Sequence, residues 1–372
     1  MKKLLVILAA AALVCAFTVP APAADWNFYG SARLATFYIS DDYGDFVLAS
    51  TGDDGDSELQ WDMQSNSRLG ATVKGENVKG QVELGITQTP NGSSGDAARV
   101  RRLYGTWNFG AGTFKVGKDY TPVSQFISGQ VFAGDNGLLG YGTYYGFRRG
   151  QAALSFGGFN IAAITTSTSN LGAVGDVDSY IPKLEASWGM GFDNFSFGLM
   201  GGFQTYTIED ATSLVDGRQN DVDVDSYVIG AMGTFNIGPG YIKGSVAYDQ
   251  NGFEGGWLTA IGAPEYLGFS IWDGDDDVND VNTFQAALVG GFKMSDMLSF
   301  EGGFGYADID WDVDGFDNYA QWNAYVQAVV VMAPGVYVIP EVGYFDFGDF
   351  ADDSDIDQGN TFYAGAKWQI DF

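Results

Sequence analysis

The side chains in this sequence that could do chemistry are charged rather than nucleophilic. The chain has 372 residues, of which 47 are acidic, 18 are basic, one is cysteine and none is histidine. A Ser–His or His–metal mechanism is therefore excluded, and no glycine loop ends in the Gly-Lys-Ser/Thr of a phosphate-binding loop. The acidic balance excludes a general nucleic-acid binder, which needs a basic surface. We expect no enzyme and no cofactor, but electrostatic handling of ions or solutes.

Five bases alternate with apolar neighbours. In a strand, successive side chains point to opposite faces, so these bases share the face opposite to residues such as Leu34, Leu69 and Phe114. A row of bases on one face can attract and orient ions and polar solutes. The five bases are Arg33, Arg68, Lys74, Arg102 and Lys115.

Acidic residues gather in segments between the apolar stretches. Closely spaced carboxylates suit Ca²⁺ or Mg²⁺, which prefer oxygen ligands, but the run from Asp273 to Asp280 lacks a terminal Glu at calcium-loop spacing. We expect no specific metal site, and weak Ca²⁺ or Mg²⁺ binding stays open. A solvated acidic rim would enrich cations, which favours cation selectivity. The acidic segments lie near residues 41–45, 52–56, 273–277 and 351–355.

The elements that would position these residues are strands. The last residues alternate strictly, with Phe362, Trp368, Ile370 and Phe372 on one face and Lys367 on the other. Such alternation predicts a strand with one apolar and one polar face. Sixteen segments of this kind occur, near residues 26–38, 59–74, 78–89, 99–109, 113–119, 150–156, 159–167, 179–190, 195–208, 224–237, 241–250, 281–294, 298–309, 319–333, 336–347 and 359–372.

The connections between these segments alternate between short and long. Short turns include 75–77, 110–112, 238–240, 295–297 and 334–335, and long loops include 39–58, 120–149, 209–223, 251–280 and 348–358. This asymmetry predicts an antiparallel up-and-down sheet. With an even number of strands the last can pair with the first, which closes the sheet and removes its edges. Lipid would then cover the apolar face, so we predict an all-β transmembrane barrel.

The N-terminus predicts export. Lys2 and Lys3 precede an apolar run from Leu4 to Val19, and Ala21-Pro22-Ala23 follows. These are the three parts of a secretory signal, so we expect a leader over 1–23 and a barrel domain over 24–372. A large secreted β-sandwich or solenoid is the soluble alternative. Aromatic residues at the turn ends, such as Trp26, Phe109, Phe114 and Phe372, are typical of a membrane-interface girdle and favour the barrel.

The chain resembles the trimeric general porins of the Gram-negative outer membrane. The likeness lies in the sixteen segments, the first strand Trp26-Asn27-Phe28-Tyr29-Gly30, the Phe-terminated last strand, and Val116-Gly117-Lys118-Asp119-Tyr120-Thr121-Pro122 before the long loop 120–149. The resemblance implies outer-membrane lipid and lipopolysaccharide as surroundings, the barrel-assembly machinery, a homotrimer, and passive diffusion of small hydrophilic solutes and ions. The family's acidic Pro-Glu-type motif is missing from that loop.

The resemblance also implies a constriction. The loop 120–149, or loop 3, would fold inward and place acids opposite a ladder of the five bases, with Asp119 and Asp135 as the facing acids. Pairing of the bases with acids such as Glu83 is the plainer interpretation. Regular alternation would turn Arg99 and Arg101 toward the lipid face, which leaves two placements open: above the bilayer or at a subunit interface.

Two other functions stay open from the sequence. Tyr141, Tyr144 and Tyr145 in loop 3 leave open a substrate-specific channel for an anion or a sugar, since lumen aromatics could stack on a solute. A structural or adhesive barrel is the other alternative.

Overall fold

The structure is a computed structural model that describes residues 24–44, 55–87, 97–168, 171, 174–212, 219–258, 271–272, 278–311, 318–350 and 356–372. The leader expected over 1–23 and most of the acidic loop segments lie outside these ranges. Among the described residues, no helix is long and apolar enough to cross a membrane.

Eighteen strands form one closed antiparallel sheet. Because β2 and β3 both pair with β1, and β9 and β10 both pair with β11, each of these two pairs is one interrupted span, which leaves the sixteen spans that the sequence predicts. The strands are β1 (Asp25–Asp42), β2 (Gly55–Met63), β3 (Ser67–Lys74), β4 (Val78–Thr87), β5 (Ala97–Asn108), β6 (Thr113–Tyr120), β7 (Arg148–Phe156), β8 (Phe159–Ile164), β9 (Val174–Asp178), β10 (Lys183–Gly191), β11 (Phe195–Thr212), β12 (Gln219–Ile237), β13 (Gly240–Gln250), β16 (Val281–Lys293), β17 (Leu298–Trp311), β18 (Tyr319–Ala333), β19 (Val336–Asp346) and β22 (Asn360–Asp371).

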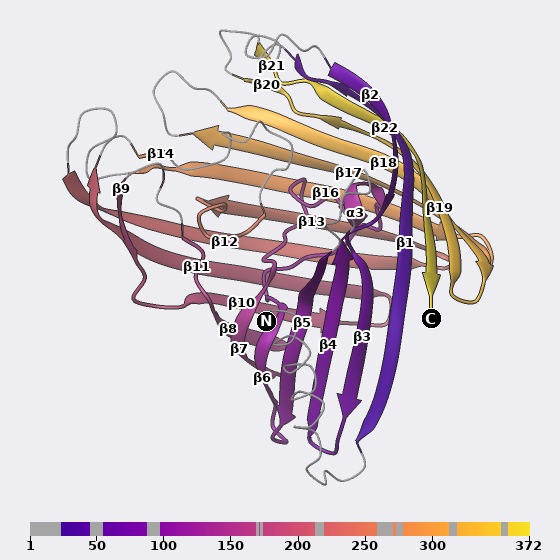
Figure 1. Cartoon of the computed structure of the whole chain (residues 1–372), viewed down its shortest axis with the longest axis horizontal. Coiled ribbons are helices and arrows are strands. Elements are labelled where there is room, and N and C mark those ends of the chain that lie inside the picture. The colour runs from indigo at the N-terminus through magenta and orange to yellow at the C-terminus, as the bar shows by residue number, and fades with distance from the viewer. Residues whose placement is uncertain are drawn as a thin grey trace, which may run out of the picture.

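The barrel closes where the last strand meets the first. β22 pairs with β1 from Ser31↔Asp371 to Asp42↔Asn360, and the two strands lie side by side in Figure 1. Gly30 and Phe372 exchange two backbone hydrogen bonds of 2.7 and 3.0 Å at the end of this seam. The sequence-based prediction of closure is confirmed, and the pairing removes the sheet edge that would otherwise invite aggregation.

Side chains alternate between the two faces of the wall. On β16, Gln285 is fully buried, whereas the neighbouring Phe284 and Leu288 are 43% and 60% exposed. Exposed apolar side chains are spread over nearly all the barrel strands. A soluble protein rarely exposes so much contiguous apolar surface, so the outer face is suited to lipid. Two small hairpins, β14 (Ile271–Trp272) with β15 (Val278–Asn279) and β20 (Asp349–Phe350) with β21 (Ile356–Asp357), lie outside the main sheet.

Loop 3, residues 121–147 in the structure, folds into the barrel. It contains the short helix α3 (Phe132–Asp135), which Figure 1 shows amid the ring of strands. Apolar loop residues pack on the inner wall: the Phe132 ring stacks on Tyr363 with centroids 3.8 Å apart, and Leu138 is fully buried beside Val289. The apolar composition of this loop therefore reflects its burial inside the barrel.

Candidate functional site

A cavity of about 910 Å³ lies between loop 3 and one side of the inner wall. The wall contributes residues of β1, β3, β5, β6, β7, β8, β10 and β22. Seven bases line the cavity against two acids. The bases are Arg33, Arg68, Arg99, Arg101, Lys115, Arg148 and Lys367, and the acids are Asp119 and Asp135.

Three acids on this side of the barrel each lie between two bases. Asp135 contacts Arg33 at 2.6 Å and Lys367 at 2.8 Å. Glu83 contacts Arg101 at 2.8 Å and Arg68 at 3.7 Å. Asp119 contacts Arg102 at 2.7 Å and Lys115 at 2.9 Å. Six bases thus share three acids, so this part of the wall keeps more positive than negative charge.

Two further arginines have no carboxylate within ion-pair distance in the described part of the chain. Arg99 donates to the Ser65 carbonyl at 3.2 Å. Arg148 donates to the Tyr120 hydroxyl at 3.1 Å and lies over the Tyr120 and Tyr145 rings at 5.2 and 5.6 Å. Burial raises the pKa of the Tyr145 hydroxyl, so this ring stays neutral and adds no negative charge. With these two, eight bases oppose three acids.

A β-bulge turns extra arginines inward. Glu83 of β4 pairs with Arg102, but the next residue, Leu84, pairs with Val100, so Arg101 is an additional residue in β5. A bulge lets two neighbouring residues break the alternation, and both Arg101 and Arg102 form ion pairs with inward-facing acids. Arg99 also lines the cavity. The expectation that Arg99 and Arg101 face lipid is wrong, because it assumed a regular strand.

Three glutamates on the rest of the wall hold the backbone of loop 3. Glu185 on β10 accepts from Val123 N at 2.8 Å, and Glu301 on β17 accepts from Gly129 N at 2.6 Å. Glu341 on β19 accepts from Val131 N at 2.7 Å and Phe132 N at 2.9 Å. Carboxylates that accept backbone N–H groups form strong, charge-assisted bonds. These bonds fasten the loop to β10, β17 and β19, and the cavity lies between the loop and the basic part of the wall.

Comparison with solved structures finds the same barrel architecture in outer-membrane channels. The outer membrane channel DcaP of Acinetobacter baumannii matches with a TM-score of 0.70 at 17% identity, covering 94% of this chain and 97% of that one. The chain has the fold of an outer-membrane porin. An anion-selective porin from Comamonas acidovorans (TM-score 0.58, 15% identity, 94% and 100% coverage) and OmpF of Salmonella typhi (0.56, 13%, 93% and 97%) match as well. No family model and no curated protein sequence matches the chain.

The porin barrel brings most of the predicted bases together. Arg33, Arg68 and Lys115 line the cavity. Arg102 does not line it, but forms an ion pair with the lining residue Asp119. Lys74 does not line it; this residue is exposed at the end of β3, beside a short turn. The role of these bases in permeation stays a prediction.

The two predicted acids occupy different places in the porin barrel. Asp135 lies on loop 3, and it reaches the wall through Arg33 and Lys367. Asp119 does not face the bases, because it is part of β6 and lies among them. Both acids are ion-paired directly, so the residues that the structure describes do not form two opposed rows of charge.

The loop 3 tyrosines divide into two groups. Tyr141 and Tyr144 are fully buried and anchor the loop: Tyr141 contacts Phe345, and the Tyr144 hydroxyl donates to Asp249. Burial raises the pKa of both hydroxyls, which stay protonated. Of the three, only Tyr145 lines the cavity, where Tyr120 and Phe126 are further aromatic residues on which a solute could stack.

Sequence reasoning missed Lys367 and Arg148 as lining residues. Lys367 was detectable, because strict alternation puts it opposite to Trp368 and Ile370 on the terminal strand. Arg148 follows loop 3 directly, where alternation has not yet begun, so no pattern marked it.

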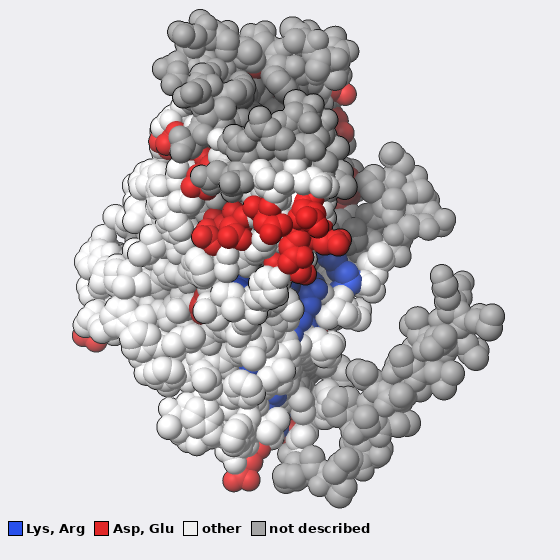
Figure 2. All heavy atoms as spheres, turned by 90° about the vertical axis from the view of Figure 1, so that its left-hand side faces the viewer, with Lys and Arg blue, Asp and Glu red and all other residues white. Residues whose placement is uncertain are grey.

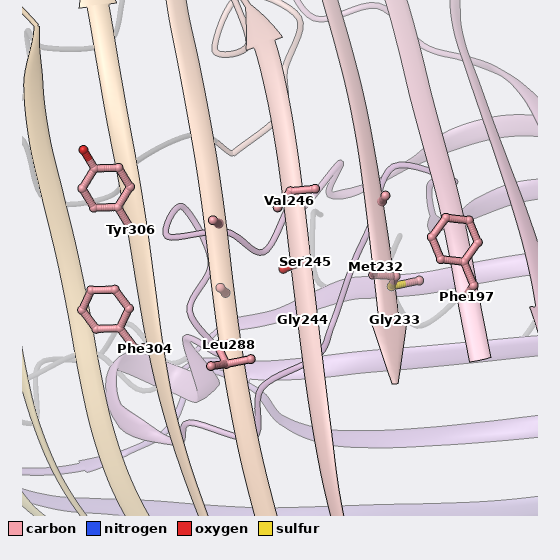
Figure 3. A pocket seen from close by; sticks show the side chains of 12 residues that line it. Phe197, Met232, Gly233, Gly244, Ser245, Val246, Leu288, Phe304 and Tyr306 are labelled. Carbon is pink, nitrogen blue, oxygen red and sulfur yellow. The ribbon is translucent and has the colours of Figure 1, made fainter. Parts of the chain in front are cut away.

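Two other surface features belong to the outer side. An apolar groove of about 440 Å³ spreads over β11, β12, β13, β16 and β17 beside Val246, Leu288 and Phe304 (Figure 3). Figure 2, which views the left-hand side of Figure 1, shows a cluster of acidic side chains across the upper middle of the face, with Lys and Arg side chains directly below and beside it. Among the described acids, Asp176 on β9 and Asp223 and Asp225 on β12 are exposed. The described residues contain no cluster that could hold a metal ion, and the acidic runs 273–277 and 351–355 lie outside them.

Proposed function

We propose that this protein is an outer-membrane diffusion channel for small hydrophilic solutes, with a preference for anions and no enzymatic activity. The proposal rests on one observation: eight bases oppose three acids around the cavity beside loop 3. Charged groups at a constriction select ions of the opposite sign, because field lines concentrate in a narrow aqueous path with low-dielectric walls.

This proposal reverses the selectivity that the acidic loops favour. Acids at the mouth act through water, and their field falls off within about 10 Å at 0.1 M salt. The bases of the wall lie directly on the path at its narrow part. We therefore infer that the wall, and not the rim, sets the sign of selectivity.

The surroundings of the protein are part of the same proposal. The apolar outer face supports insertion into the outer membrane, and the acidic end supports contact with lipopolysaccharide through divalent cations. OmpT of Vibrio cholerae, which has a similar fold (TM-score 0.55, 15% identity), occurs in a trimer form. We propose a homotrimer here too, assembled by the barrel-assembly machinery after a leader over 1–23 is removed.

Liposome swelling tests the proposal. Proteoliposomes are placed in iso-osmotic solutions of a neutral sugar, an organic anion with a permeant counter-ion, and an organic cation of the same size. A channel of this kind admits all three in the order anion, neutral solute, cation. Liposomes that contain verified, folded barrel and do not swell would contradict the diffusion channel and support a structural or adhesive barrel. Admission of the anion alone would support a substrate-specific channel.

A further inference from the structure

A second segment folds into the barrel besides loop 3. It comprises residues 251–258, directly after β13, and we name it the inner clasp. We propose that the inner clasp and loop 3 together obstruct the β10–β13 side of the barrel, and so confine permeation to the basic wall. The inference deepens the proposed function, since it assigns the residues that restrict the path.

Glu185 joins both segments to the wall. Its Oε2 accepts from Val123 N of loop 3 at 2.8 Å, and its Oε1 accepts from Trp257 Nε1 of the inner clasp at 2.9 Å. Lys183 lies 3.1 Å from the same Oε1 and donates to the Gly255 carbonyl at 3.1 Å. The side chains of both Lys183 and Glu185 are 0% exposed. A buried ion pair holds its geometry only when its remaining hydrogen bonds are satisfied, and here the two inward segments supply them.

The wall is shaped to receive the indole of Trp257. A Cβ at Gly202 on β11 would lie 2.5 Å from the Trp257 ring, so only glycine leaves room there. Gly255 makes similar room within the clasp, and Gly256 has a φ of 66°, which glycine adopts without strain. Trp257 is 1% exposed and packs in one cluster with Val123 and Tyr144.

Two more contacts connect the inner clasp to loop 3. Asp249 accepts from the Tyr144 hydroxyl and from Gly252 N, the latter at 3.0 Å. Leu258 N donates to the Tyr145 carbonyl at 2.9 Å. Tyr145 lines the cavity, whereas no residue of the inner clasp does. The clasp therefore acts by position: it supports Tyr145 from behind and occupies part of the space between loop 3 and β10–β12.

Loss of the clasp would open a path with different electrostatics. The wall side chains beside it include two buried acids, Glu185 and Asp249, and two bases, Lys183 and Arg149. A path opened there would be lined by acids and bases in equal number, without the excess of bases that surrounds the cavity beside loop 3. Conductance would then rise while the anion-to-cation permeability ratio falls. A general loosening of the barrel could raise conductance without lowering this ratio.

Single-channel recording of Trp257→Ala and Gly202→Val tests this. Trp257→Ala removes the indole, and Gly202→Val displaces it, because the new side chain on β11 fills the space that the ring occupies. Both should raise conductance by on the order of 1.5-fold and lower the anion-to-cation permeability ratio, because pore width and lining charge set both quantities. Trp107→Ala, which removes a tryptophan 54% exposed on the outer face, should leave both unchanged. Folded variants that conduct and select like the native protein would overturn the inference.

A cross-link tests the placement without any channel activity. Tyr145 and Leu258 are antiparallel bridge partners, a spacing compatible with a disulfide. The chain's one cysteine, Cys15, lies in the expected leader. Tyr145→Cys with Leu258→Cys should form an intramolecular disulfide in the folded, detergent-solubilised barrel, and neither single variant should. Absence of the disulfide would overturn the inference, even if Trp257→Ala or Gly202→Val fails to fold. If the disulfide forms in the double variant but the native protein does not conduct, the proposed diffusion channel is contradicted, whereas the placement of the clasp is supported.

Discussion

The amino group of Lys367 lies 2.8 Å from the carboxylate of Asp135, and this contact joins the last strand of the barrel to the end of α3. Arg33 on β1 lies 2.6 Å from the other oxygen of the same carboxylate. β1 and β22 are the two strands whose pairing closes the barrel. Loop 3 is therefore fastened across the closing seam, and the acid that fastens it is shared by two lumen bases.

Asp135→Asn should loosen loop 3 and strengthen anion preference. The change leaves Arg33 and Lys367 without their carboxylate, and it weakens hydrogen bonds to a charged group worth about 1.5–3 kcal/mol. We expect noisier single-channel currents and a higher anion-to-cation permeability ratio. Asp296→Asn, at an exposed turn, is the matched control and should change neither. A lower ratio in Asp135→Asn would contradict the assignment.

Arg99→Gln with Arg148→Gln should shift selectivity toward cations and leave the fold intact. Neither arginine has a carboxylate partner in the described chain, so no acid loses its counter-charge when they are removed. The measurement is the reversal potential in a salt gradient. Lys79→Gln with Lys293→Gln, two exposed bases at the short-turn end, removes the same charge away from the cavity. Equal shifts in the two double variants would show that net charge, and not the cavity lining, sets selectivity.

Glu83→Gln should destabilise the barrel strongly. The Glu83 and Arg101 side chains are 4% and 5% exposed, and removal of one partner from a buried pair costs about 3–5 kcal/mol. The free energy of unfolding in urea, measured in detergent or lipid, checks this. Replacement of both partners, as Glu83→Leu with Arg101→Met, should cost less than Glu83→Gln alone, because no charge is left unpaired. A double variant that is less stable than the single one would contradict the argument.

The barrel was predictable because each strand repeats one physical rule. Alternation of apolar and polar residues, short turns on one end and the Phe372-terminated strand specify sixteen spans and their closure. The same rule places Arg33, Arg68 and Lys115 inside. It fails at Arg99 and Arg101, since one bulged residue reverses the faces of the residues before it, and nothing in the local pattern marks the bulge.

The contacts of the two inward segments were not predictable for a different reason. Asp135, Trp257 and Tyr144 meet wall residues that are distant in sequence, and no periodicity relates them. The apolar composition of loop 3 indicates burial, but not the glutamates that hold it. The inner clasp carries the sequence Gly255-Gly256-Trp257, which looks like an ordinary turn until Gly202 is seen opposite.

Phe132→Ala should make loop 3 mobile. The Phe132 ring stacks on Tyr363 and contacts Phe37 and Phe345, and truncation of a buried Phe costs about 3–5 kcal/mol. Much of that cost should appear as local opening of the loop, because the barrel wall is unchanged. We expect frequent transitions between conductance levels and faster protease cleavage within 121–147. Steady native-like currents would show that the three glutamates hold the loop without the aromatic anchor.

The sign of the reversal potential of the native channel tests the central claim most directly. Purified protein is inserted into a planar bilayer under a tenfold KCl gradient at low ionic strength. If the eight bases beside loop 3 set selectivity, the potential has the sign of a chloride-selective path, and it falls as salt rises and screening increases. A potassium-selective potential at low salt would contradict the account and would assign selectivity to the acidic loops.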